Sequence, residues 1–87
     1  MRSEQILEEL ERAADKLGVR VSYETLAGDV GPGGLCKVKG QWRAILDRRA
    51  PASEKVALLA HALSQFDLDA VFLSPEVRDI IDRKRKS

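Results

Sequence analysis

The first run of apolar positions predicts a helix over residues 3–17. Its apolar residues recur at the i, i+4, i+7, i+11 spacing of one helix face: Ile6, Leu10, Ala13 and Leu17. Ser3 stands where an N-cap is expected, and Glu4 follows where a carboxylate interacts favourably with the helix dipole. Gly18 predicts the end of the helix, because glycine adopts the left-handed conformation after a helix without steric cost.

Alternation of apolar and polar residues then predicts three β-strands. The first covers about residues 19–25, with the apolar positions Val19, Val21 and Tyr23. Residues 26–34 are rich in glycine and predict a loop. The second and third strands, at about 35–39 and 42–47, are close enough in sequence to form a hairpin.

The hairpin turn has two possible positions. A glycine that opens a two-residue connection favours a type II′ turn at Gly40 and Gln41, and a turn at Lys39 and Gly40 with a bulge is the alternative. Both divide the side chains in the same way. One face carries Cys36, Val38, Arg43 and Ile45, and the other carries Leu35, Lys37, Lys39, Trp42, Ala44 and Leu46.

Two more helices are predicted after the hairpin. Pro51 ends the hairpin, Ser53 is the expected N-cap, and one apolar arc follows at helical spacing: Val56, Leu59, Ala60, Leu63 and Phe66. Residues 71–73 are a short apolar run, either extended or in a turn beneath the helices. Ser74, followed by Pro75, predicts the start of the last helix, since proline favours the first helical position.

These elements predict one α+β domain over residues 1–87, in which a three-stranded antiparallel sheet has about three helices packed mainly on one face. The basic tail at 83–87 is expected to fray. The expected core comprises Ile6, Leu10, Leu17, Val21, Val38, Ile45, Leu59, Leu63, Phe66, Phe72 and Ile80.

Composition narrows the class of protein. With 44% hydrophobic and 33% charged residues, the chain has the balance of an ordinary globular domain, and its net charge of +1 provides no global attraction to nucleic acid. Its one cysteine, Cys36, excludes an intrachain disulfide and indicates a reducing compartment. The sequence contains neither an apolar run of membrane-spanning length nor a signal-peptide pattern, so the expected localisation is cytoplasmic.

The helix that contains His61 has the position of a zinc-peptidase helix. A hydrolase of that type needs His-Glu-x-x-His, in which two histidines bind zinc and the glutamate takes a proton from the bound water. The text "ILDRRAPASEKVALLAHALSQ", with the order helix, three strands, helix, resembles the core of the ImmA/IrrE-type zincin-like metallopeptidases over roughly residues 4–66. The resemblance places the first zinc ligand at His61, but puts Ala62 at the general base and Gln65 at the second ligand.

The chain therefore resembles a truncated, degenerate core of that family, and no catalytic residue, metal site or cofactor is expected. No stoichiometric zinc, peptidase activity or small-molecule substrate is expected. The segments "GGLCKVKG" and "FLSPEVR" are also similar to small bacterial proteins, a likeness that implies no function. His61 is interpreted as a surface imidazole and Cys36 as a buried, unreactive thiol. The glycine-rich loop at 28–34 is interpreted as a connection, because it leads into a strand and not into a helix N-terminus.

Three functions follow from these predictions, in decreasing order of preference. The first is a non-catalytic interaction module that forms a homodimer or binds a partner protein through a sheet face left uncovered, consisting of Leu35, Lys37, Lys39, Trp42, Ala44 and Leu46. The alternative is a nucleic-acid-binding accessory protein that uses Lys37, Lys39, Trp42, Arg48, Arg49, Arg83, Lys84, Arg85 and Lys86. A residual metal-dependent hydrolase is third.

Overall fold

The computed structural model describes residues 2–25 and 33–86. In chain order its elements are α1 (Ser3–Leu17), β1 (Val19–Glu24), β2 (Gly33–Val38), β3 (Gln41–Asp47), α2 (Ala52–Leu63) and α3 (Pro75–Lys86). The α+β prediction is therefore confirmed. No helix in the described ranges is long and apolar enough to cross a membrane.

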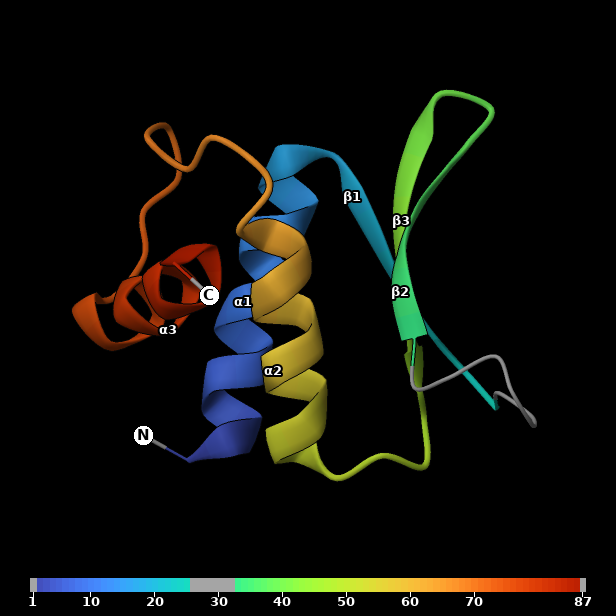
Figure 1. The fold of residues 1–87 in the computed structure, drawn as a ribbon, viewed down its shortest axis with the longest axis horizontal. Helices are drawn as coiled ribbons and strands as arrows, with labels where there is room; N and C mark the ends of the chain where they lie inside the picture. Colours follow the sequence, from blue (N-terminus) through green and yellow to red (C-terminus); the bar gives the residue numbers. More distant parts are fainter. Residues whose placement is uncertain (1, 26–32, 87) are drawn as a thin grey trace.

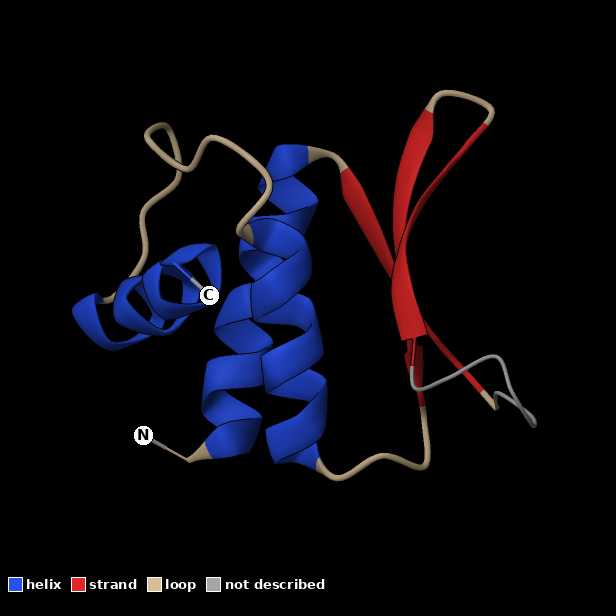
Figure 2. Cartoon of the chain, viewed as in Figure 1, coloured by secondary structure: helices blue, strands red, loops and turns tan. Residues whose placement is uncertain are grey.

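The elements form three layers. Helices α1 and α2 lie side by side in the middle, the sheet packs on one side of this pair, and α3 packs on the other (Figure 1). Figure 2 shows the same arrangement, with all strands on one side of the helix pair. One hydrophobic cluster joins the layers, and its largest fully buried side chains are Leu10, Leu46, Leu59, Leu63, Val77 and Ile81.

The sheet is mixed, which corrects the predicted antiparallel sheet. Its strand order is β1-β3-β2, so β3 is central. β2 pairs with β3 antiparallel, as expected of a hairpin, but β1 pairs with β3 in parallel. Because the chain reverses once between β1 and β2 and again between β2 and β3, the first and third strands run in the same direction and can be neighbours.

The hairpin turn consists of Lys39 and Gly40, with φ angles of 51° and 82°. Two consecutive positive φ angles are typical of a type I′ turn, whose twist matches that of the flanking strands. The type II′ turn at Gly40 and Gln41 is therefore wrong, since Gln41 already pairs with Val38. The predicted division of side chains between the two faces is confirmed by the strand register.

The helices cover the face that was expected to be open. Ala44 and Leu46 are only 1% and 2% exposed, whereas Val38 on the opposite face is 43% exposed. Trp42 packs edge-on against Phe66, with ring centroids 5.6 Å apart, at the side of the sheet next to the helices. Both faces mix apolar with basic residues, so alternation alone did not decide which one the helices would cover.

This reversal accounts for most of the errors in the predicted core. Ile6, Leu10, Leu59 and Leu63 are buried as expected, and four more residues of the prediction pack partly buried against the core: Leu17, Val21, Phe66 and Ile80. Val38 and Ile45 belong to the uncovered face. Phe72 is 85% exposed, whereas Val71 and Leu73 on either side of it are buried in the segment between α2 and α3.

Two helix ends follow local signals, whereas α1 has Arg2 as its N-cap in place of the predicted Ser3. Gly18 adopts the left-handed conformation, with φ of 79°, and ends α1 as predicted. The hydroxyl of Ser74 accepts a hydrogen bond from the backbone N–H of Val77 at 3.4 Å, so the predicted start of α3 is also confirmed. α2 begins two residues earlier than predicted, with Pro51 as its N-cap in place of Ser53.

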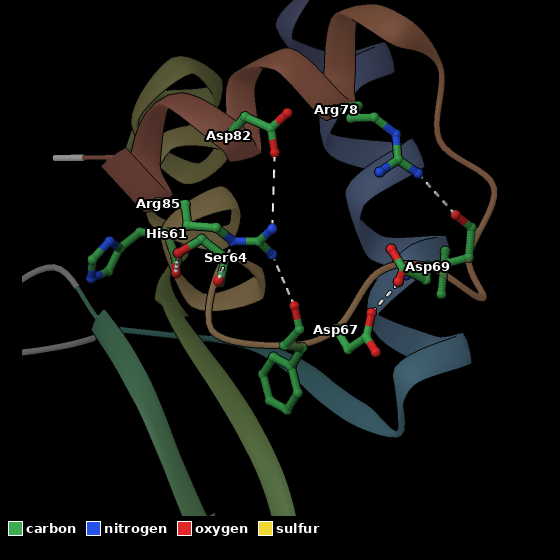
Figure 3. Close-up of polar contacts among 9 residues, drawn as sticks. His61, Ser64, Asp67, Asp69, Arg78, Asp82 and Arg85 are labelled. Carbon is green, nitrogen blue, oxygen red and sulfur yellow. Dashed lines mark hydrogen bonds and ion pairs between the residues drawn. The ribbon is translucent and has the colours of Figure 1, made fainter.

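The basic C-terminal segment is helical to Lys86, where fraying was expected. Arg85 lies across the end of α2 and donates hydrogen bonds to the carbonyl oxygens of Ser64 at 3.0 Å and Phe66 at 2.9 Å (Figure 3). These carbonyls follow the last turn of a helix, where backbone acceptors lack intrahelical donors. Arg83 adds an ion pair to Asp79 one turn earlier, at 2.6 Å.

Candidate functional site: the open face of the sheet

The candidate site is the sheet face that points away from the helices, called here the open face. Its side chains come from all three strands: Arg20, Ser22, Glu24, Cys36, Val38, Arg43, Ile45 and Asp47. Within the described ranges no helix or strand packs against this side of the sheet (Figure 1). An exposed apolar surface with charged surroundings is typical of an interface with another chain.

The register orders the charges of the open face along the strands. Arg20 pairs with Arg43 across β1 and β3, and Glu24 pairs with Asp47 two rows of the same face further on. Ile45, paired with Ser22, lies in the row between them. The face is therefore basic at one end, acidic at the other, and apolar at the centre of β3.

The basic end has unsatisfied hydrogen-bonding capacity. The Nε atom of Arg43 is buried and has no hydrogen-bond partner among the described residues. Buried polar groups in proteins are nearly always hydrogen-bonded, and a guanidinium is a rigid donor suited to a carboxylate. Arg20, beside it in the register, is exposed. This end of the face is thus suited to accept an acidic group.

At the acidic end, Asp47 is held by hydrogen bonds within the chain. The backbone N–H of Arg49 donates to Oδ1 of Asp47 at 3.0 Å, and this hydrogen bond lowers the pKa of the Asp47 carboxyl. The Arg49 side chain pairs with the same oxygen at 3.4 Å. Glu24 is exposed and accepts a hydrogen bond from the Ser22 hydroxyl at 3.4 Å. Glu24 is therefore the more available of the two carboxylates.

The residues predicted to bind a partner lie mainly under the helices. Ala44 and Leu46 are buried in the core, and Leu35 and Trp42 pack partly buried against it. The Lys37 ammonium lies 5.4 Å from the centroid of the Trp42 ring, a cation–π contact within one molecule. Of the six residues predicted for this surface, Lys39 alone lies outside the β-strands, in the exposed hairpin turn. Most of the predicted surface is therefore not open to a partner protein.

The structure does not bring the basic residues of the nucleic-acid prediction together. The hairpin and α3 lie on opposite sides of the α1–α2 pair (Figure 1). Several of these side chains have partners within the chain. Arg48 donates to the Tyr23 carbonyl at 2.9 Å, Arg49 pairs with Asp47, and Arg83 pairs with Asp79. Lys84, Arg85 and Lys86 lie on α3, and Trp42 is partly buried and packs edge-on against Phe66.

His61 is an exposed side chain on α2. Its imidazole points away from Asp67 and Asp69, the next carboxylates along the chain (Figure 3). In the described part of the chain, no three His, Cys, Asp or Glu side chains lie close enough together to hold a metal ion. Cys36 is a free cysteine that is partly buried on the open face, where the sequence suggested a core thiol. Most of the glycine-rich loop at 28–34 lies outside the described residues.

Tyr23 on the covered face connects the sheet to α1. Its hydroxyl donates a hydrogen bond to the Glu11 carboxylate, and the Lys55 ammonium lies 5.2 Å from its ring centroid. Burial and then the hydrogen bond to Glu11 raise the pKa of the Tyr23 hydroxyl well above its ordinary value. Sequence alternation placed Tyr23 on this face, but nothing in the local sequence indicated Glu11 as its partner.

This hydrogen bond predicts a loss of stability at alkaline pH. The folded protein holds Tyr23 neutral, whereas an unfolded tyrosine ionises near pH 10. The contribution of Tyr23 to the free energy of unfolding is therefore complete below about pH 10 and falls as the pH rises above it. Urea melts of the unmutated protein and Tyr23→Phe should give a stability difference that shrinks above this pH. A difference that stays constant would contradict the prediction.

Comparison with known proteins does not add a family. No family model, no curated protein and no solved structure matches the chain.

Proposed function

We propose that this protein is a small, non-catalytic interaction module that forms a homodimer through the open face of its sheet. The supporting observation is the order of charges on that face, from Arg20 and Arg43 to Glu24 and Asp47. A symmetric dimer needs a surface that is complementary to itself. The lone cysteine suits a reducing, cytoplasmic setting for such a module.

The dimer geometry follows from symmetry. Two copies face each other across a twofold axis that runs between the sheets, perpendicular to the strands and above Ile45. This rotation reverses the strand direction in the second copy. The Arg20 and Arg43 row of each molecule then lies opposite the Glu24 and Asp47 row of the other, and the two Ile45 side chains meet at the centre. A parallel alignment would place the two arginine rows against each other and is disfavoured by repulsion.

Apolar contacts and charges have different roles in this interface. Burial of Ile45 and of the exposed Val38 contributes about 25 cal/mol for each Å² of apolar surface removed from water. The ion pairs set the orientation and the rate of association more than the affinity. The partner's carboxylates also supply acceptors close to the guanidinium of Arg43, whose Nε is unsatisfied in the single chain.

Nucleic-acid binding is the alternative function, and it has less support. It requires a continuous basic surface, and the basic residues of the hairpin and of α3 are separated by the α1–α2 pair. The chain does not carry the net charge that would compensate for this separation. The two functions differ in the contacts that hold the complex together. The dimer interface has both apolar and ionic contacts, whereas nucleic-acid binding depends chiefly on the release of counterions.

A charge exchange tests the homodimer. Arg20→Glu should weaken dimerisation by about tenfold or more, equal to about 1.4 kcal/mol, because symmetry replaces two attractive pairs with two repulsive ones. The double variant Arg20→Glu with Glu24→Arg should restore dimerisation, since each introduced glutamate would again face an arginine of the other copy. Sedimentation over a range of protein concentrations measures the dissociation constant of each variant.

Lys86→Glu is the matched control, because it changes the net charge equally at the exposed end of α3. It should leave dimerisation unchanged. An unmutated protein that is monomeric at high concentration would refute the proposal. A double variant that dimerises no better than Arg20→Glu alone would also refute it, because in the antiparallel alignment the exchange of both charges restores the attractive pairs.

A further inference from the structure

The outer edge of β1 offers unpaired backbone groups. In the described ranges β1 pairs with β3 alone and is an edge strand. The backbone N–H of Arg48 donates to the carbonyl oxygen of Glu24 at 2.9 Å, which continues the ladder to β3 and shows that Glu24 faces inward. Because successive residues of a parallel strand point their backbone groups to opposite sides, Val19 and Val21 face outward. Such an edge is a template for a further strand.

A groove runs along this edge. A cavity of about 590 Å³ lies between β1 and the C-terminal half of α1, lined by Glu11, Asp15, Gly18, Val19, Arg20, Val21 and Gln41. Its volume is within the range of pockets that bind small ligands and short peptides. At the far end of β1 the guanidinium of Arg48 donates a hydrogen bond to the carbonyl oxygen of Tyr23 at 2.9 Å, so the stretch of unpaired backbone groups ends there. The edge therefore offers a defined segment around Val19 and Val21.

The helix wall of the groove is acidic. Glu11 and Asp15 are one turn apart on α1 and both line the cavity, and Asp15 is exposed. Glu8 extends the same side of α1 by another turn, along an adjoining depression that is lined by three carboxylates, Glu8, Glu11 and Asp15, and by two basic residues, Arg12 and Lys16. A strand added to β1 would place alternate side chains toward this wall. Lysine or arginine at those positions would be complementary to it.

We propose that the groove between β1 and α1 binds an extended basic peptide, which adds as a strand to the outer edge of β1. The peptide backbone pairs with the outward N–H and C=O groups of Val21, and alternate basic side chains lie along Glu11 and Asp15. Backbone pairing supplies affinity, and the charge on α1 selects the side chains. The site adjoins the proposed dimer interface, because Arg20 of the open face also lines the cavity, but the backbone groups that would pair with the peptide lie at the outer edge of β1.

A synthetic heptapeptide, Ser-Lys-Thr-Lys-Thr-Lys-Ser with a fluorescent label, is the probe for this site, and fluorescence anisotropy measures its binding. The unmutated protein should bind it with saturation. Asp15→Lys should weaken binding by about tenfold or more. Glu4→Lys makes the same charge change at the other end of α1, away from the groove, and should have little effect.

Strand addition is tested separately from charge attraction. Val21→Pro removes the outward N–H that the peptide needs, and proline is tolerated on an edge strand when its position faces solvent. Val21→Ala retains the N–H and is the matched control. A peptide N-methylated at alternate residues tests the same hydrogen bonds without altering the protein. The proline variant and the methylated peptide should both abolish saturable binding.

Two outcomes would overturn the inference. Equal binding of the methylated peptide would mean that the contact is electrostatic only. Equal binding of a peptide with glutamate in place of lysine would mean that Glu11 and Asp15 do not select the ligand. Neither outcome bears on the homodimer, because both compare peptides on the unmutated protein.

Discussion

Leu46→Lys should leave the chain unfolded under conditions in which the unmutated protein is folded. Leu46 on β3 is 2% exposed and belongs to the core beneath the helices. The substitution removes a buried apolar side chain and places an ammonium group in a core without buried charged residues among those described, at a combined cost above about 5 kcal/mol. Since small domains are stable by only about 5–15 kcal/mol, this change should remove most or all of the stability.

Ile45→Lys is the matched control for Leu46→Lys. The two positions are neighbours in sequence, but Ile45 lies on the open face, where a lysine ammonium can reach water. We expect Ile45→Lys to fold with a loss of about 1 kcal/mol or less, and to be monomeric in sedimentation. Far-ultraviolet circular dichroism and urea melts compare the two variants. A folded Leu46→Lys beside an unfolded Ile45→Lys would mean that the helices cover the other face.

Leu63→Ala should have the second largest effect and lower the free energy of unfolding by about 2–5 kcal/mol. Leu63 is fully buried near the end of α2, in the cluster that joins the sheet, the helix pair and α3. Its truncation loses apolar burial and leaves a cavity that the surrounding side chains fill only in part. Urea melts should show a lower midpoint with an unchanged slope, since the surface exposed on unfolding hardly changes.

His61→Ala, two residues earlier on the same helix, provides the comparison. The imidazole is exposed and points away from the neighbouring carboxylates (Figure 3), so its loss should change stability by about 0.5 kcal/mol or less. The pair of variants also tests the orientation of α2. A larger loss from His61→Ala than from Leu63→Ala would contradict the packing of this helix.

The proposed sites required tertiary information. Arg20 and Glu24 are ordinary alternating residues of a strand, and their alignment with Arg43 and Asp47 depends on the parallel pairing of β1 with β3. The groove along β1 depends on the same pairing, because it leaves the outer side of β1 without a strand partner in the described ranges. The sequence prediction placed the hairpin correctly but expected an open face where Trp42 and Leu46 are packed under the helices.

The sequence by itself determined the local features of this protein. Gly18 ends α1 and Ser74 begins α3 because a backbone conformation and a cap depend on only a few neighbouring residues. The strand period of two likewise sorted the hairpin side chains into the correct two groups. Only the tertiary structure decided which group is buried and which strand lies in the centre. Both outcomes depend on how α1 and α2 dock and on a pairing between strands that are distant in sequence. The local sequence carries no signal for either outcome, because both faces of the hairpin mix apolar with basic residues.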